Sequence, residues 1–374
     1  MKVLQFGKFY PPVVGGIESV MFDLTEGLNA HGVQTDVLCS NKINQSSLET
    51  VNGTYQVSRS ASWGQIFSTS ISPAMIVKLA QVVKDYDVLH VHLPDPMANL
   101  AIWLVRPECK IVIHWHSDIV KQKKLLKLYR PLQDWLLRRA DSIIVTSEAY
   151  LESSLDLARF KSKVVIVPIG IRDPISFTSE IAVKKLQEKY HSKRIVFSLG
   201  RMSYYKGFSY LVDAAKYLDD DTVILIGGSG ELLAGLQMKI DSSGLADKVK
   251  LLGKIPHEEL FSYYSYCDLF CLPSIFKSEA FGVVLLEAMA FSKPIIATEI
   301  PDSGVPWVNC HDVSGINVPI MDSVALAKAI NSILSDKDLL RRYADGARDR
   351  YLSMFTADKM VLSTSKLYAD ILAS

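Results

Sequence analysis

The stretch Arg194-Ile-Val-Phe-Ser-Leu-Gly-Arg-Met-Ser-Tyr-Tyr-Lys-Gly207 begins as a short apolar run and passes directly into a loop with two glycines and two cations. Such a run, bounded by glycine, is typical of a buried strand in a parallel sheet. Similar runs recur along the chain, and stretches with helical spacing of apolar residues separate them, as in βαβ units. The sequence therefore predicts an α/β protein.

The runs fall into two series. We expect strands near 2–7, 33–39, 87–92, 110–114, 142–146 and 163–167, and then near 194–199, 222–227, 248–252, 268–272, 294–297 and 315–318. A polar stretch, 172–180, separates the series and has a turn signal without apolar periodicity. The chain of 374 residues is long enough for two to three domains of about 150 residues. We therefore predict two domains, 1–172 and 173–356, followed by a helical segment, 357–374, whose pattern alone allows packing on either domain.

The composition excludes several classes of protein. With 41 Lys and Arg against 40 Asp and Glu, the net charge of +1 lacks the basic footprint of a nucleic-acid binder. Five widely spaced cysteines do not form a disulfide framework and favour a reducing, cytoplasmic setting. The N-terminal apolar run is too short for a signal peptide. Nowhere does the sequence run for about 18 apolar residues without a charged one, so we expect no membrane-spanning helix.

The first candidate binding segment is 8–18, between the first strand and the first helix. Gly15 and Gly16 let the backbone approach a ligand closely, and a helix start attracts phosphate. A plain tight turn would need the same glycines, so both interpretations stay open.

A second candidate is Ile111-Val-Ile-His-Trp-His-Ser-Asp118, a strand that ends in polar residues. His116 can hydrogen-bond a substrate, and Asp118 can accept from hydroxyls. His90 and His92 end the preceding strand in the same way. Most of these histidines can equally be structural, and His116, nearest the loop, is the best functional candidate.

Two further candidates carry charge. Arg201 and Lys206 lie on one loop beside glycines, which suits a diphosphate, although two solvated surface cations would give the same pattern. In segment 277–287 we expect a helix from about Phe281, with Glu279 in the loop before it. Glu287 would lie one turn into that helix and could bridge ribose hydroxyls, or it could be the ordinary Glu of an amphipathic helix.

Taken together, these residues resemble the retaining family 4 glycosyltransferases. The resemblance covers most of the chain and rests on Gly15-Gly16-Ile17-Glu18, His116, Gly200-Arg201 with Lys206-Gly207, Gly227-Gly228-Ser-Gly230-Glu231, and the pair Glu279 and Glu287. It implies the GT-B architecture, two facing Rossmann-like domains with a deep interdomain cleft, and a terminal helix, 357–374, that returns to the N-terminal domain. In this respect the chain is similar to bacterial polysaccharide and O-antigen sugar transferases.

The resemblance also implies roles for individual residues. Arg201 and Lys206 would stabilise the leaving diphosphate, Glu279 would bind a donor-sugar hydroxyl, and His116 would contact the transferred sugar. Nucleotide contacts would come from Gly15, Gly16, Lys254, Ile255, Phe281, Gly282, Val283, Val284 and Glu287. Many family members have His-Gly where this chain has His116-Ser117-Asp118, which opens a possible contact of Asp118 with sugar or acceptor.

The implied reaction is a front-face transfer of a hexose from GDP-mannose or a UDP-hexose to a glycan hydroxyl, with the diphosphate taking the acceptor's proton. The nucleotide sugar is a substrate, and no cofactor or metal is expected. Metal-dependent transferases use an Asp-x-Asp pair, but Asp219 to Asp221 precede a strand and so lie at its amino end, where we expect a solvated turn.

The segment 121–139 has seven cations, one acid and leucines on roughly one side. It could lie on an anionic membrane surface, which would favour a lipid-linked acceptor in surface polysaccharide synthesis, or it could be an ordinary surface helix. We expect a cytoplasmic protein, with membrane association at the inner face if the first interpretation holds.

Two other functions fit two Rossmann-like halves. A nicotinamide oxidoreductase lacks its glycine fingerprint here, and a non-catalytic nucleotide-sugar-binding protein would not need the whole proposed catalytic set. The transferase hypothesis treats Lys206 as a surface-loop cation, needed for transfer and dispensable for folding.

Overall fold

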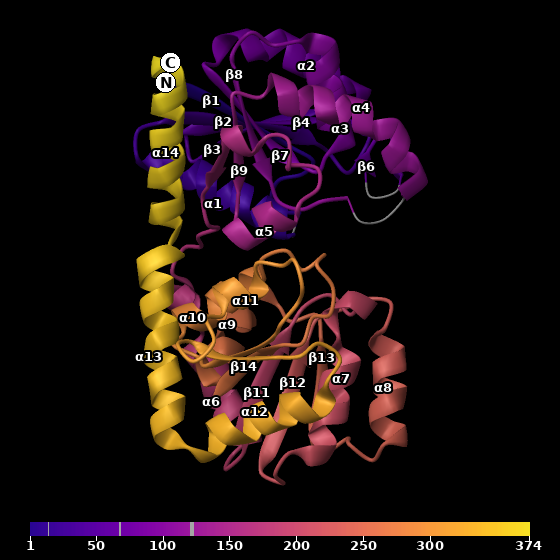
Figure 1. Ribbon diagram of the computed structural model, residues 1–374, viewed down its shortest axis with the longest axis vertical. Helices are drawn as coiled ribbons and strands as arrows, with labels where there is room; N and C mark the ends of the chain where they lie inside the picture. The colour runs from indigo at the N-terminus through magenta and orange to yellow at the C-terminus, as the bar shows by residue number, and fades with distance from the viewer. Residues whose placement is uncertain (14, 67–68, 120–122) are drawn as a thin grey trace. The chain divides into compact units, whose positions relative to one another are not determined.

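The computed structural model describes residues 1–13, 15–66, 69–119 and 123–374, with only the backbone described for 123–127 (Figure 1). The chain forms two compact units. The first unit comprises Met1–Gly170 and Ala357–Ser374, and the second comprises Ile171–Thr356. The division after Gly170 lies two residues before the boundary expected from the sequence, and the last segment belongs to the first unit.

The first unit is built on a mostly parallel sheet of order β10-β9-β8-β7-β1-β2-β4-β3. Its strands are β1 (Lys2–Gly7), β2 (Gln34–Ser40), β3 (Ser47–Val51), β4 (Tyr55–Ser60), β7 (Val88–Leu93), β8 (Lys110–Trp115), β9 (Ser142–Val145) and β10 (Val164–Ile166). A two-stranded sheet pairs β5 (Gln65–Ile66) with β6 (Thr69–Ser70). The central strands β7 and β8 are almost entirely buried, as strands covered on both faces must be.

The expected strand list omitted β3 and β4. These strands pair antiparallel with each other, and β4 extends the sheet parallel to β2. Every residue of β3 except Val51 is exposed, so the strand lacks the apolar run on which the expectation depended. An edge strand can be polar because only one of its sides is paired and covered.

Helices cover the faces of this sheet (Figure 1). They are α1 (Gly16–Ala30), α2 (Pro73–Val82), α3 (Pro96–Val105), α4 (Lys123–Arg139), α5 (Glu148–Ser153) and α14 (Ala357–Ala373). Helix α14 packs against α1 so closely that a Cβ on Gly27 would lie 2.4 Å from a methyl of Val361. Close packing of this kind makes the last helix an integral part of the first unit.

The second unit contains a fully parallel sheet of order β13-β12-β11-β14-β15-β16. Its strands are β11 (Arg194–Leu199), β12 (Thr222–Gly227), β13 (Val249–Gly253), β14 (Leu269–Leu272), β15 (Ile295–Thr298) and β16 (Gly315–Val318). Its helices are α6 (Glu180–Lys189), α7 (Phe208–Ala214), α8 (Leu233–Ser242), α9 (His257–Tyr266), α10 (Val283–Ala290), α11 (Val305–Val308), α12 (Ser323–Ser335) and α13 (Lys337–Met354). Both units are thus Rossmann-like halves with ligand loops expected at the carboxyl ends of their strands.

Candidate active site

Three loops of the second unit pack backbone against backbone where β11, β12 and β13 end. Gly200 N donates to Gly227 O at 3.1 Å, and Gly228 N donates to Gly253 O at 2.7 Å. A Cβ on Gly228, whose φ is +132°, would lie 1.9 Å from Gly200 O. Only glycine fits at that position, and the close contact fixes the loop that carries Arg201.

Lys206 and Glu279 form a buried ion pair between the loops that follow β11 and β14 (Nζ to Oε2). Lys206 is 7% exposed, and Ser274 Oγ donates to the same Glu279 oxygen at 3.0 Å. Burial alone would lower the pKa of the Lys206 ammonium, but the charge of Glu279 outweighs it and the pKa is raised. Lys206 therefore stays charged in a site with little water.

The expectation that Lys206 is a surface-loop cation is therefore wrong. The loop folds inward because Gly207, at φ +69°, approaches Pro273 O too closely for any side chain, and Ile275 N donates to Tyr205 O at 2.8 Å. Arg201, by contrast, is exposed, and its charge acts to lower the pKa of Lys206. The structure thus brings Arg201, Lys206 and Glu279 together, as the site hypothesis required.

Helix α10 begins at Val283, two residues later than expected. Gly282 precedes it in the left-handed conformation, φ +78° and ψ 58°, so Phe281 lies outside the helix and packs against Trp307 and Phe355. The first turn, which includes Val283 and Val284, offers N–H groups that have no acceptor within the helix.

Glu287 lies on α10 and accepts a hydrogen bond from Tyr264 Oη at 2.6 Å. Burial and the neighbouring Glu287 both raise the pKa of the Tyr264 phenol, so Tyr264 remains a donor at neutral pH. The contact orients one carboxylate oxygen of Glu287. Sequence reasoning missed Tyr264 because α9 contains several tyrosines, and nothing in the sequence distinguishes this one from the others.

The proposed base contacts lie after β13. Ile255 packs over Gly227, where a Cβ would meet its Cδ1 at 2.5 Å, and Lys254 beside it is exposed. These two residues therefore border the same group of loops as Arg201.

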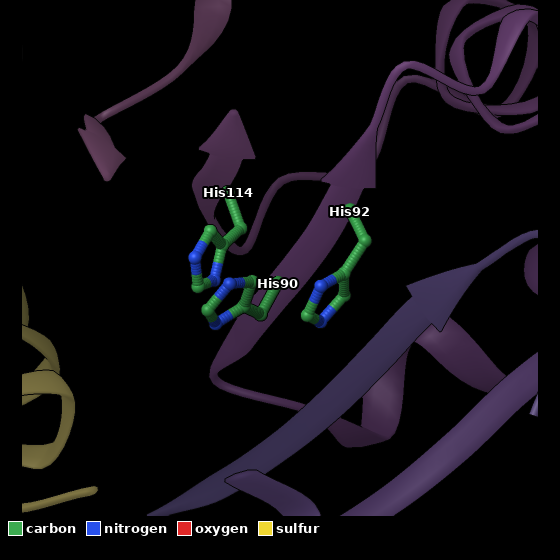
Figure 2. Close-up of side chains that lie close together, drawn as sticks. All are labelled: His90, His92 and His114. Carbon is green, nitrogen blue, oxygen red and sulfur yellow. The ribbon is translucent and has the colours of Figure 1, made fainter. Parts of the chain in front are cut away.

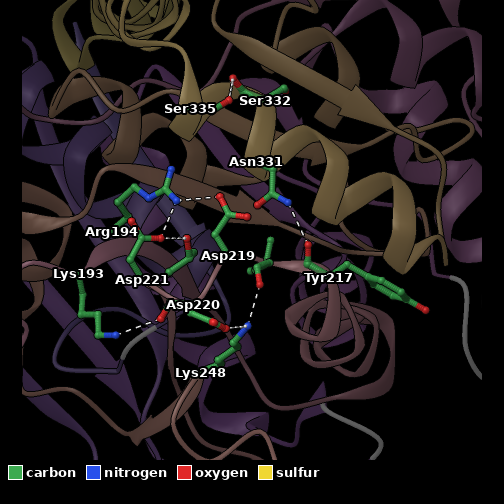
Figure 3. A network of polar contacts seen from close by, with 12 residues as sticks. Lys193, Arg194, Tyr217, Asp219, Asp220, Asp221, Lys248, Asn331, Ser332 and Ser335 are labelled. Atoms are coloured by element: carbon green, nitrogen blue, oxygen red, sulfur yellow. Dashed lines mark hydrogen bonds and ion pairs between the residues drawn. The ribbon is translucent and has the colours of Figure 1, made fainter.

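The three aspartates 219–221 lie at the opposite, amino end of β12, as expected. Arg194 binds Asp219 at 2.9 Å and Asp221 at 2.5 Å, and Lys248 binds Asp220 at 2.9 Å (Figure 3). Each carboxylate thus faces a cation of this chain. These ion pairs tie the amino ends of neighbouring strands together, far along the strand from the loops described above.

In the first unit, Gly15 and Gly16 stand at the start of α1. A Cβ on Gly15 would lie 2.2 Å from an Oε2 of Glu18, whereas a Cβ on Gly16 would meet open space. Glu18 therefore lies back over the first turn and stabilises the positive end of the helix dipole.

Four buried histidines line one face of β7 and β8. His92 and His114 are in register, and His90 and His116 lie two residues away on the same face. Their rings stack. The ring centroids are 4.8 Å apart for His90 and His92 and 4.2 Å apart for His114 and His116. Figure 2 shows His90, His92 and His114. Burial is the largest cause that lowers the pKa of all four, to about 3 for His114, so the rings are neutral at pH 7.

The residue types His90, His92 and His114 could hold a transition metal, and their ring nitrogens lie within 4.8 Å of one another. The rings are stacked, however, with interplanar angles of 9° for His90 and His92 and 21° for His92 and His114. Their in-plane lone pairs therefore run side by side and do not converge. The arrangement suits a stack of aromatic rings better than a coordination sphere.

Asp118 has a structural role in the loop after β8. Its Oδ1 accepts from Trp115 Nε1 at 3.0 Å and from Ser154 Oγ at 2.8 Å. Its backbone N–H donates to Tyr150 Oη. The side chain thus anchors the loop that begins at His116, which differs from the direct sugar contact considered from the sequence.

Comparison with known proteins identifies the family. Residues 14–173 match the model of "Glycosyltransferase Family 4", and residues 180–350 match "Glycosyl transferases group 1". The chain is 34% identical to the O-antigen chain mannosyltransferase C of Escherichia coli over the full length of both proteins. This chain is a glycosyltransferase of that family.

The glycosyltransferase is also 31% identical to the D-rhamnosyltransferase WbpZ of Pseudomonas aeruginosa, covering 96% of this chain and 93% of the relative. Among solved structures, a sucrose-phosphate synthase from Thermosynechococcus elongatus superposes with a TM-score of 0.82 at 23% identity, over 100% of this chain and 99% of that one. An Anabaena protein solved with UDP-glucose gives 0.78 at 20% identity, over 99% and 100%. These likenesses confirm the GT-B fold.

Family membership removes the nicotinamide oxidoreductase as an explanation of the two Rossmann-like halves. Within the described ranges of the glycosyltransferase, no helix is both long enough and apolar enough to cross a bilayer.

Proposed function

We propose that this glycosyltransferase moves a mannose-configured hexose from a nucleotide diphosphate donor to a hydroxyl of a lipid-linked glycan during O-antigen or related polysaccharide synthesis. Two relatives above 30% identity carry the names mannosyltransferase and D-rhamnosyltransferase, and D-rhamnose is 6-deoxy-D-mannose. The shared configuration of these sugars favours a manno donor over a gluco donor.

The observation that carries the proposal is the buried Lys206–Glu279 pair with Arg201 beside it. A sugar leaves a nucleotide diphosphate most readily when fixed cations meet the departing negative charge, and they act most strongly where water is excluded. Arg201 supplies a second, planar donor group suited to phosphate oxygens. The start of α10 adds N–H groups, so charge, hydrogen-bond donors and burial favour the same leaving group.

We further propose that the transfer retains the anomeric configuration. Retaining glycosidases place a free carboxylate as nucleophile close to a second carboxylate. Here Glu279 already holds Lys206 and Ser274, which suits a binding role toward a sugar hydroxyl. The departing diphosphate then accepts the acceptor's proton on the same face, and the reaction needs no metal ion.

Helix α4 supports a membrane-bound acceptor. Leu128 is 81% exposed on α4, and Trp103 and Leu104 are exposed on α3, which packs against it. Lys121 and the side chains of 123–127, which include three further lysines, lie outside the described part of the chain. Apolar side chains beside cations favour docking on anionic lipid, which we place at the cytoplasmic face of the membrane.

The test of the function is transfer itself. Purified protein is incubated with GDP-mannose, UDP-glucose or UDP-galactose, with a lipid-linked oligosaccharide acceptor, in the presence of EDTA. We expect product with GDP-mannose, and an α linkage by NMR, which matches the donor's anomer. A β-linked product would contradict retention. Donor binding without any turnover across the donors and acceptors would instead favour a non-catalytic binding protein.

The membrane proposal has its own test, flotation with vesicles that contain anionic phospholipid. Leu128→Glu should reduce the bound fraction, because it places a charge in the apolar contact. Ile181→Glu is the matched control, since Ile181 is an exposed apolar residue of the second unit. Equal loss in both variants, or none in Leu128→Glu, would count against docking through α4.

A further inference from the structure

A chain of buried side chains connects His116 to the C-terminal helix. His116 Nε2 lies 2.9 Å from His92 Nδ1, and His92 Nε2 lies 2.8 Å from Gln5 Oε1. At the other end of the same amide, Gln5 Nε2 donates to Tyr368 Oη at 3.4 Å, and Tyr368 also contacts His90 Nδ1. All of these side chains are buried.

The parallel register places these groups on one face. Gln5 of β1 pairs with His90 of β7, and His92 pairs with His114 of β8, so their side chains project to the same side of the sheet. Tyr368 reaches this face from α14. The chain of contacts is therefore built by residues of β1 and β7, by His116 directly after the end of β8, and by the last helix.

The direction of each hydrogen bond follows from the amide. Gln5 Oε1 can only accept, so His92 Nε2 must carry the proton. A neutral His92 then has a lone pair on Nδ1, which accepts from Nε2–H of His116. A neutral His116 consequently has a lone pair on Nδ1. Burial supports neutrality, since it lowers the pKa of both rings.

We propose that Gln5 and His92 are positioning residues that fix His116 in the Nε2–H tautomer, with Nδ1 as the acceptor for a hydroxyl of the transferred sugar. This inference rests on the proposed function, which gives His116 its contact with that sugar. Among the described residues, the hydrogen bond made by the His116 ring is that of Nε2 with His92. Nδ1 is thus the ring nitrogen of His116 left to act on a ligand.

The chemical value of an acceptor lies in the transition state. As the sugar ring gains oxocarbenium character, its hydroxyls become more acidic, and hydrogen bonds that they donate become stronger. A neutral Nδ1 acceptor gains from this change, whereas an N–H group at the same place would not. We call the hydrogen-bonded series from Gln5 through His92 to His116 the relay. The relay therefore acts on kcat more than on donor binding.

The stack offers a matched control. His114 packs directly on His116, with ring centroids 4.2 Å apart, yet neither of its ring nitrogens has a partner among the residues described. His114→Phe removes a histidine and keeps an aromatic ring of similar shape. His92→Phe does the same and also breaks the relay, so the two variants differ mainly in the hydrogen bonds.

The first readout is the tautomer. In protein labelled with ¹⁵N-histidine, His116 of the wild type should show a protonated Nε2 and an unprotonated Nδ1, assigned by loss of the signals in His116→Gln. His92→Phe and the milder Gln5→Met should shift both signals toward a mixture of tautomers, while His114→Phe leaves them in place. A protonated Nδ1 in the wild type, or no change in His92→Phe and Gln5→Met, would overturn the proposal.

The second readout is kinetic. We expect kcat to fall roughly 10-fold in His92→Phe and Gln5→Met, the lower end for loss of a partner that orients a site histidine. The donor KM should change by no more than about twofold, as should both parameters in His114→Phe. Equal losses in His92→Phe and His114→Phe would reduce the relay to ordinary packing.

The two readouts separate the inference from the function. If the protein transfers no sugar, the proposed function fails, and the NMR spectrum still decides whether the relay sets the tautomer. If transfer occurs and the spectrum of His92→Phe matches that of the wild type, the relay alone fails.

Discussion

The two sheets place different kinds of polar group where their central strands end. In the second unit the buried groups are ionised, and Lys206 and Glu279 neutralise each other. In the first unit they are neutral, since four stacked imidazoles are held below their usual pKa by burial. Both solutions avoid an isolated buried charge, which folding cannot tolerate.

The difference indicates what each edge can do. An ion pair beside Arg201 leaves an excess of positive charge and suits a ligand that becomes more negative during reaction. A neutral stack carries no charge to repel a sugar whose ring becomes positive. Burial thus imposes the same constraint on both units, and they meet it with an ion pair in the second and with neutral rings in the first.

The largest effect is expected when the ion pair of the second unit is broken. Lys206→Ala should lower kcat by about 10²- to 10³-fold, the usual cost of removing one group that stabilises developing negative charge. It should also lower the free energy of unfolding by about 3 kcal/mol, because Glu279 is left buried without its partner. Steady-state kinetics and urea unfolding measure both.

Two variants separate the effects on rate and stability. Lys206→Ala with Glu279→Gln should recover part of the stability and none of the activity. Lys216→Ala, which removes an exposed cation paired with Asp213, should leave both nearly unchanged. A Lys206→Ala enzyme with wild-type turnover would remove Lys206 from the site.

The next effect concerns the stack of neutral histidines in the first unit and its influence on stability at low pH. Below pH 6.5 the unfolded chain protonates its histidines while the buried rings of the folded state do not, so stability is lost as the pH falls. Each buried ring costs about 2 kcal/mol at pH 5 relative to pH 7.5. Asp95, whose pKa is raised to about 6 by burial, opposes this loss in part. Tyr368 remains neutral throughout this range.

His114→Phe should therefore reduce the loss of stability between pH 7.5 and pH 5 by about 1 to 2 kcal/mol, as measured by urea unfolding at each pH. His191→Phe, at an exposed position, is measured in the same way as the control for replacing a histidine by phenylalanine. An unchanged pH dependence in His114→Phe would show that this ring protonates freely.

A smaller effect is expected on the affinity for the nucleoside diphosphate. Glu287→Gln should weaken binding of the nucleoside diphosphate about 10-fold, because a charged acceptor for ribose hydroxyls becomes neutral. Titration calorimetry measures the affinity. Glu180→Gln, at an exposed position on α6, should bind normally. An affinity equal to that of the wild type would exclude Glu287 from the ribose contact.

The smallest effect is expected at the amino end of the second sheet. Asp219→Asn with Asp221→Asn should change the transfer rate by less than about twofold, because exposed ion pairs contribute little. Addition of EDTA to either protein should also leave the rate unchanged. Loss of activity that Mg²⁺ or Mn²⁺ restores would show that these carboxylates hold a metal after all.

Much of this arrangement could be predicted from the sequence because it follows from topology. Apolar runs that end in glycine or histidine predict parallel strands, and their carboxyl ends must meet at one edge of each sheet. The fold class and the family were confirmed, and Arg201, Lys206 and Glu279 do lie together. The polar edge strand β3 escaped detection because its pattern has no apolar run.

What could not be predicted depends on contacts between distant segments. The burial of Lys206 requires the loop at Pro273 to close over Gly207, and no local pattern reports that approach. Gln5 and Tyr368 lie 363 residues apart, and only the packing of α14 unites them. Two His-x-His repeats on adjacent strands were a usable signal for the stack, but the register that aligns them came from the structure.

The contribution of Tyr368 to the first unit has a consequence for biosynthesis. Helix α14 follows the entire second unit in the chain, so the ribosome must translate residues 171–356 before the first unit can be completed. At typical translation rates this delay lasts roughly 10 to 40 s. During that time Gln5 lacks one of its partners, and the face that α14 covers is open. The nascent chain therefore acquires the contact between Gln5 and Tyr368 only after the second unit has had time to fold.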